Sequence, residues 1–141
     1  MRRSTIRKVE DILRDYPKID DYIEEREQQL RYPTGQTDEN IGGGRAQFKY
    51  NEATLDTLIT IDEDRRINAL KWQREIIDDC LDGVDKNTEK IIEELYFKKH
   101  PQYTLLGLVN NHVVNVSQRH AYELRNGFVS EVAKKLGLYD L

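Results

Sequence analysis

The stretch VVNVSQRHAYELRNGFVSEVAKKL, residues 113–136, has the pattern of a capped helix with two unlike sides. Its apolar residues recur every three or four positions and share one side of a helical wheel: Ala121, Leu124, Phe128, Val132 and Leu136. Ser117 is a good N-cap, and Val116 before it can pack on Ala121 as a hydrophobic staple. We therefore predict a helix from Gln118 onward that buries its apolar side.

The remaining side of this helix is polar. Opposite the apolar residues lie Arg119, Tyr122, Glu123 and Asn126, with Gln118 and Arg125 on one flank and His120 on the other. A short helix, LLGLVNN, which Thr104 can cap, and a turn precede it. A helix, a turn and a longer helix with polar first turns form a helix-turn-helix, whose second helix enters the major groove of DNA.

These residue types suit DNA contacts, because arginine can make two hydrogen bonds to guanine, and glutamine or asparagine two to adenine. The residues predicted to read bases are Gln118, Arg119, Tyr122 and Asn126, with Arg125 beside them. Those predicted to hold phosphates are Ser117, Thr104, Lys98 and Lys99. The alternative is a plain amphipathic helix that closes a bundle, and Glu123 on the outer side and a turn without glycine favour it.

The N-terminal part also has a helical pattern. Apolar residues follow at a three-four spacing: Ile6, Val9, Leu13, Tyr16, Ile23 and Leu30. Pro17 predicts a kink, or a second helix with the proline in its first turn. Because four of these residues repeat every seven positions, we predict a homo-oligomer, most simply a dimer.

A long middle helix is predicted after a loop at about residues 31–50. The helix runs from Asn51 to Asp82, roughly 45 Å, and the polar run 62–66 can interrupt it. Its broad apolar side consists of Leu55, Leu58, Ile59, Ala69, Leu70, Ile76, Ile77, Cys80 and Leu81. After Gly83, Thr88 is the predicted cap of the next helix, before the short helix and the final one.

The predicted fold is therefore all-α. An N-terminal helical hairpin and the long middle helix form an assembly module at residues 1–83, and residues 84–141 form a helix-turn-helix DNA-binding module. Residues 51–83 carry four basic and nine acidic side chains, whereas residues 84–141 carry eight and seven. This distribution permits DNA binding by the C-terminal module without indicating it, and the acidic middle segment is predicted to face away from DNA.

Composition excludes several classes of protein. No apolar run reaches the ~20 residues of a membrane span, and no signal peptide is expected, because Arg2 and Arg3 are followed by a mixed helix and not by an apolar run. The single Cys80 cannot form an intramolecular disulfide, so we expect a protein of the bacterial cytoplasm.

No enzyme, cofactor or metal is predicted either. The acidic group Glu75, Asp78, Asp79 and Asp82 lies around one helix, the three histidines lack a metal-binding spacing, and IGGGR lacks the Lys-Ser/Thr of a phosphate-binding loop.

Three stretches in order carry a family resemblance: STIRKVEDILRDYP at 4–17, PTGQTDENIGG at 33–43, and ELYFKK followed by VSQRHAYELRNGFVSEVAKKLG at 94–137. The chain resembles the RinA/ArpU type of phage late-gene transcriptional activators, and its C-terminal part resembles the region 4 helix-turn-helix of sigma factors. The resemblance implies a phage or prophage regulator that binds double-stranded DNA upstream of late genes, with bacterial RNA polymerase as a possible partner.

Two other functions fit the same pattern. A small terminase subunit would also use a helix-turn-helix on phage DNA, and it would form a closed ring with a large ATPase as partner. A purely structural helical protein would assemble without binding DNA. Salt-dependent duplex binding separates the last from the other two.

Overall fold

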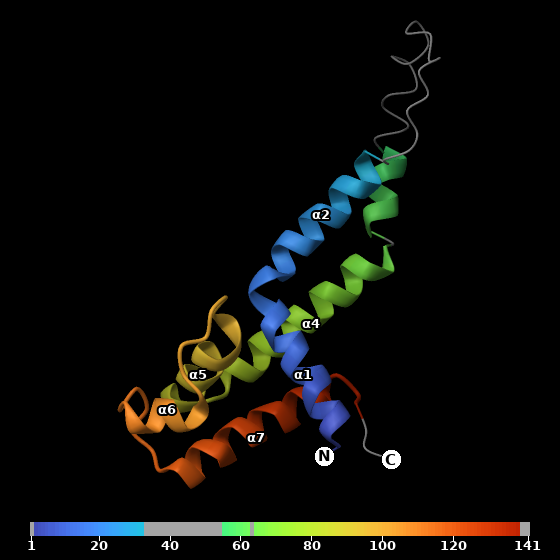
Figure 1. The fold of residues 1–141 in the computed structure, drawn as a ribbon. Coiled ribbons are helices and arrows are strands. Elements are labelled where there is room, and N and C mark those ends of the chain that lie inside the picture. The colour runs from blue at the N-terminus through green and yellow to red at the C-terminus, as the bar shows by residue number, and fades with distance from the viewer. Residues whose placement is uncertain (1, 33–54, 63, 139–141) are drawn as a thin grey trace, which may run out of the picture. The chain divides into compact units, whose positions relative to one another are not determined.

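The computed structural model describes residues 2–32, 55–62 and 64–138, and every secondary-structure element in these ranges is helical. The elements are α1 (Arg3–Asp15), the 3₁₀ turn η1 (Tyr16–Lys18), α2 (Ile19–Arg31), a helix at 55–62, α4 (Arg65–Asp82), α5 (Lys86–Ile92), the π-helical turn η2 (Glu93–Phe97), α6 (Leu105–Asn110) and α7 (Gln118–Lys135) (Figure 1). The predicted all-α class is confirmed. Beyond Tyr32, the predicted loop and its IGGGR segment lie outside the described residues.

The chain divides into two compact units. The first contains Met1–Lys18 and Gln73–Leu141, and the second contains Ile19–Trp72. Helices α1 and α2, predicted as a hairpin, belong to different units. Pro17 lies in the 3₁₀ turn between them, where the sequence predicted a break in the helix. The functional boundary predicted between residues 83 and 84 lies inside the first unit, and as a division of labour it stays a prediction.

The predicted middle helix is interrupted at its polar run, and its predicted start at Asn51 lies outside the described residues. Helix α4 begins at Arg65, because Asp64 is not helical and its carboxylate Oδ1 accepts the backbone N–H of Ile67 at 3.0 Å. A capping carboxylate satisfies a free N–H at a helix start, so the polar run 62–66 interrupts the helix. Only the second half of the apolar side is buried: Ile76, Ile77 and Cys80 are, whereas Leu55, Leu58, Ile59 and Ala69 are exposed.

In the second unit, isoleucines from three helices are buried: Ile19, Ile23, Ile61 and Ile67. Arg26 of α2 adds two hydrogen bonds to the Asp64 carboxylate, at 3.2 Å from Nε and 2.9 Å from Nη2. The Arg26 contacts and the Ile67 N–H hold the pKa of Asp64 below its ordinary value. The ion pair therefore links α2 to the start of α4.

The first unit has a core built by segments far apart in sequence. It contains Val9 and Leu13 of α1, Ile76, Ile77 and Cys80 of α4, Ile92, Tyr96 of η2, and Phe128, Val129, Val132 and Ala133 of α7. The predicted apolar side of the final helix is thus confirmed, and it extends to Val129 and Ala133. Two tyrosine hydroxyls tie this core at its edge: Tyr16 donates to Asp78, and Tyr96 donates to Glu10.

No helix in the described ranges has the length and apolar character needed to cross a lipid bilayer.

Candidate nucleic-acid interface

A second, smaller core joins α5, α6 and the first half of α7. Its buried residues are Ile91, Leu105, Leu108, Val114 and Ala121, and Val116 and Leu124 pack against them. Val116 and Ala121 therefore share this core, as the predicted staple requires. Helix α7 is continuous through both cores of the first unit, with Ala121 in one and Phe128 in the other.

The connection between α6 and α7 has seven residues, 111–117. The carbonyl of Leu108 accepts the N–H groups of Val113 and Val114, at 3.0 and 3.4 Å, and His112 has a φ of 55°. A typical helix-turn-helix has a three- to four-residue turn. The connection here is longer, and the assignment of a helix-turn-helix stays a prediction.

Both predicted caps of this region are confirmed. The Thr104 hydroxyl oxygen accepts the N–H of Gly107, and the Ser117 oxygen accepts the N–H of His120, each at 3.1 Å. Both residues are exposed, and each hydroxyl still has a hydrogen to donate. This geometry suits a phosphate oxygen near either helix start.

The predicted cap of α5 is wrong. Asp85, not Thr88, is the N-cap, and its carboxylate accepts both the N–H and the hydroxyl of Thr88. Thr88 is buried and lies within the first turn. These bonds lower the pKa of Asp85.

The polar side of α7 faces solvent at its start. Gln118, Arg119 and Asn126 are exposed, and the Tyr122 side chain is 39% exposed. Arg119 Nε lies 3.4 Å from Glu123 Oε1, with side chains 92% and 61% exposed. A pair so open to water contributes little to stability, so the guanidinium can exchange Glu123 for another acceptor.

Two of the predicted base-reading residues, Tyr122 and Asn126, form a local cluster with Arg125. The Arg125 guanidinium lies 5.2 Å from the Tyr122 ring centroid, and its Nε and Nη2 donate to Asn126 Oδ1 at 3.3 and 3.1 Å. Arg125 is half-buried, so it belongs less to the outer surface than the sequence indicates. A two-bond contact from Asn126 to adenine requires its amide oxygen, which Arg125 already occupies.

The two predicted phosphate-binding lysines are not equivalent. Lys98 Nζ lies 2.8 Å from Glu94 Oε1, and Lys90 Nζ lies 3.4 Å from the same oxygen. Glu94 is buried, and its pKa is lowered chiefly by the bond from Lys98. Lys99 is exposed and pairs with no acidic side chain in the described part of the chain. Lys99 is therefore the better candidate for a phosphate contact.

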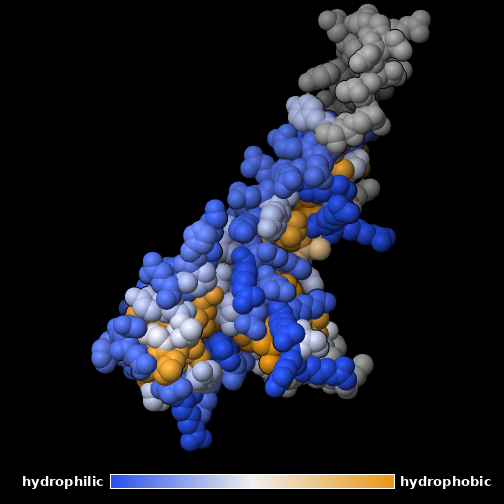
Figure 2. All heavy atoms as spheres, viewed as in Figure 1, coloured by the Kyte–Doolittle hydropathy of each residue, from blue (hydrophilic) through white to orange (hydrophobic). Residues whose placement is uncertain are grey.

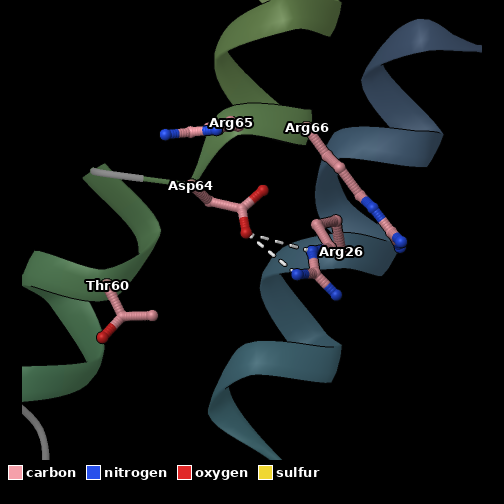
Figure 3. A pocket seen from close by; sticks show the side chains of 5 residues that line it. All are labelled: Arg26, Thr60, Asp64, Arg65 and Arg66. Carbon is pink, nitrogen blue, oxygen red and sulfur yellow. Dashed lines mark hydrogen bonds and ion pairs between the residues drawn. The ribbon is translucent and has the colours of Figure 1, made fainter.

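The second unit contains a basic pocket that sequence reasoning missed. A concavity of about 390 Å³ is lined by Arg26, Thr60, Asp64, Arg65 and Arg66 (Figure 3). The Arg66 side chain extends along the Arg26 side of the pocket, whereas Arg65 points the other way. Arg26 and Asp64 are 38 positions apart, so no local motif joins them.

On the face of the molecule shown in Figure 2, apolar side chains form patches among hydrophilic ones, and one of these patches lies over α5 and α6.

Comparisons with known proteins give a family and a relative. Residues 5–134 match the family described as "Protein of unknown function (DUF722)". The chain is 27% identical over 138 residues to "Transcriptional activator rinA" of Staphylococcus phage phi11, which covers 97% of this chain and 94% of that protein. No solved structure matches the chain significantly. The resemblance to RinA-type phage activators is thereby confirmed, and the chain belongs to the DUF722 family.

Proposed function

We propose that this protein is a phage or prophage transcriptional activator of late genes that binds double-stranded DNA in a sequence-specific way. The observation that carries the proposal is the similarity to a phage transcriptional activator along 97% of the chain. That relative matches over 94% of its own length, so the likeness is not confined to one module. The activity proposed is regulatory rather than enzymatic.

The first turns of α7 are the proposed reading surface. Gln118 and Arg119 extend from its exposed start, and Tyr122 follows one turn later. The core shared by α5, α6 and α7 supports this end of the helix, and a rigid element is what base contacts need. Arg119 would donate two hydrogen bonds to guanine after leaving Glu123.

Phosphate contacts would position the module. Ser117 and Thr104 can donate from their cap hydroxyls, and Lys99 supplies an exposed charge. Tyr122, Arg125 and Asn126 would act as one preformed group, because the arginine packs on the ring and bonds to the amide. Lys98 would contribute its charge only by leaving Glu94.

The proposal extends to partners. Bacterial RNA polymerase is the proposed protein partner, and a homodimer reading paired half-sites is the proposed assembly in the cytoplasm of the host cell. Val9 of the seven-residue repeat is part of the intramolecular core, and Tyr16 packs against it. The dimer would therefore form through other residues than the first half of that repeat.

Selection of bound duplexes from random DNA tests the proposal. A sequence-specific activator enriches one motif, and its affinity falls steeply with salt because bound phosphates release counterions. Sedimentation of the same protein separates a dimer from the closed ring of a small terminase subunit. A folded protein that enriches no motif and binds duplex no more tightly at 50 mM than at 200 mM salt would refute the proposal.

A further inference from the structure

A groove opens on the side of α7 away from the Tyr122, Arg125 and Asn126 cluster. It lies within the first unit, where the end of α4 and the start of α5 meet α7, and its volume is about 320 Å³. The lining includes apolar atoms from Cys80, Val84, Leu124 and Phe128. At ~30 Å³ per molecule this space holds roughly ten waters, which suits one or two large side chains rather than a cofactor.

Gly127 lines the same groove, and no contact in the described part of the chain requires a glycine at this position. It lies in the interior of an 18-residue helix, where glycine is less favourable than alanine. A Cβ placed on it would meet no heavy atom within 4 Å. The packing of this chain therefore does not require glycine here, whereas a bound segment that approaches the α7 backbone does.

The rim of the groove is acidic. Asp85, Glu123 and Glu131 all line it, and Glu123, Gly127 and Glu131 follow one another every four residues along α7. All three carboxylates belong to exposed residues. Two basic side chains lie close to Glu123: Arg119 Nε is 3.4 Å from its Oε1, and His120 Nδ1 is 3.6 Å from its Oε2. Lys135 is also nearby, because its charge acts on the buried Cys80. Carboxylates around an apolar floor repel phosphates and attract lysine or arginine.

We propose that this groove binds a basic, apolar segment of bacterial RNA polymerase. An apolar side chain of that segment lies over Gly127 and contacts Leu124 and Phe128, while flanking lysine or arginine side chains pair with Glu123 and Glu131. This inference rests on the proposed function, because an activator that holds DNA with one side of α7 needs another surface for the transcription apparatus. The acidic position Glu123, which disfavours DNA on this side of the helix, has a role in such a contact.

Two substitutions in the full-length protein test the groove. Gly127→Leu fills it with a side chain, and Glu131→Lys reverses the charge of its rim. Each should weaken binding to purified RNA polymerase holoenzyme by about tenfold or more, the loss expected for a central interface position. Each should leave the affinity for the selected duplex within about twofold. Glu75→Lys, an exposed charge reversal on α4 outside the groove, is the matched control and should change neither affinity.

Gly127→Ala separates folding from docking. The methyl group enters open space and favours the helix, so this variant should unfold at a higher temperature than the wild type while binding polymerase more weakly. Wild-type protein that binds duplex but not polymerase would overturn the groove proposal and leave the proposed function standing. Failure to bind duplex would instead overturn the proposed function. Dissociation of a homo-oligomer by Gly127→Leu would mean that a second copy of this chain occupies the groove, and would overturn the polymerase assignment.

Discussion

The hydroxyl of Tyr96 donates a hydrogen bond to Glu10 Oε2 at 3.1 Å, across 86 positions of sequence. The Arg14 guanidinium lies 5.6 Å from the centroid of the same ring. One residue of η2 is thus held by two residues of α1. The N-terminal helix is consequently part of the structure that supports α7, although sequence analysis assigned it to a separate assembly module.

Truncating a core residue of α1 should destabilise the first unit. Leu13 is fully buried, so Leu13→Ala should lower the free energy of unfolding by about 2–5 kcal/mol, from lost burial and the cavity left behind. Arg7→Ala, an exposed change on the same helix, should stay within about 0.5 kcal/mol. Urea denaturation of both variants measures the difference. Equal stability of the two would mean that α1 does not share the core with α7.

A fragment that begins at Val84 should fold poorly for the same reason. It lacks α1 and α4, which cover Ile92, Phe128 and Val132 in the core. We expect the fragment to lose its fixed tertiary packing, and circular dichroism with a hydrophobic dye detects this loss. A cooperative thermal transition in the isolated fragment would support the division at residues 83 and 84 instead.

The Tyr96 hydroxyl should make stability sensitive to alkaline pH. Burial, together with the charge of Glu10, raises the pKa of Tyr96 to about 12 from an ordinary value of 10. The resulting stability is fully present below the unfolded pKa near 10 and is lost as pH rises toward 12, by at most ~1.4 kcal/mol per unit. In urea titrations the advantage of wild type over Tyr96→Phe should shrink across this window. A constant difference between them would contradict the prediction.

Arg119→Ala should affect DNA recognition and not folding. If Arg119 reads guanine, its loss should cost about 1–3 kcal/mol of binding and relax preference at one base position. The free energy of unfolding should hardly change, because the Arg119 side chain is 92% exposed and its ion pair with Glu123 is open to water. Affinity for a panel of single-base variants of the selected site measures the effect. If the folded Arg119→Ala protein kept the same affinity for DNA and the same base preference, α7 would not be the helix that enters the major groove of DNA.

Lys98 and Lys99 form a matched pair of variants. Lys99→Ala should weaken all duplexes alike and lower the slope of log affinity against log salt by about one unit, with little change in stability. Lys98→Ala should reduce stability, because the buried carboxylate of Glu94 loses its nearest cation. Thermal unfolding and salt titration of both proteins separate the two roles. If both variants had the same stability and the same salt dependence, the contact between Lys98 and Glu94 would contribute nothing to stability.

Local patterns in the sequence were enough to predict the helices, whereas the arrangement of side chains between them depends on tertiary contacts. The three-four spacing was enough to place Ala121, Phe128 and Val132 on the buried side of α7, and short polar residues were enough to locate the Thr104 and Ser117 caps. The cap of α5 was misassigned because both Asp85 and Thr88 suit that position, and only the structure shows which accepts the bonds.

Contacts between residues far apart in the sequence could not be predicted from any local pattern of this kind. The burial of Val9 against α7 depends on residues more than a hundred positions away, and the Arg26–Asp64 pair that fixes the start of α4 spans 38. The contact between Arg125 and Asn126 joins adjacent residues, yet it depends on a side-chain conformation that periodicity does not specify. The base contacts themselves stay a prediction.

The passage of α7 through two cores has a consequence for how such a protein can diverge. Every turn of the helix is anchored by inward residues, from Ala121 to Ala133, so outward positions such as Gln118 and Arg119 are free of packing constraints. Substitutions there cost little stability. If these positions read bases as proposed, related proteins could exchange these side chains, one at a time, and acquire new target sequences while inheriting the same scaffold unchanged.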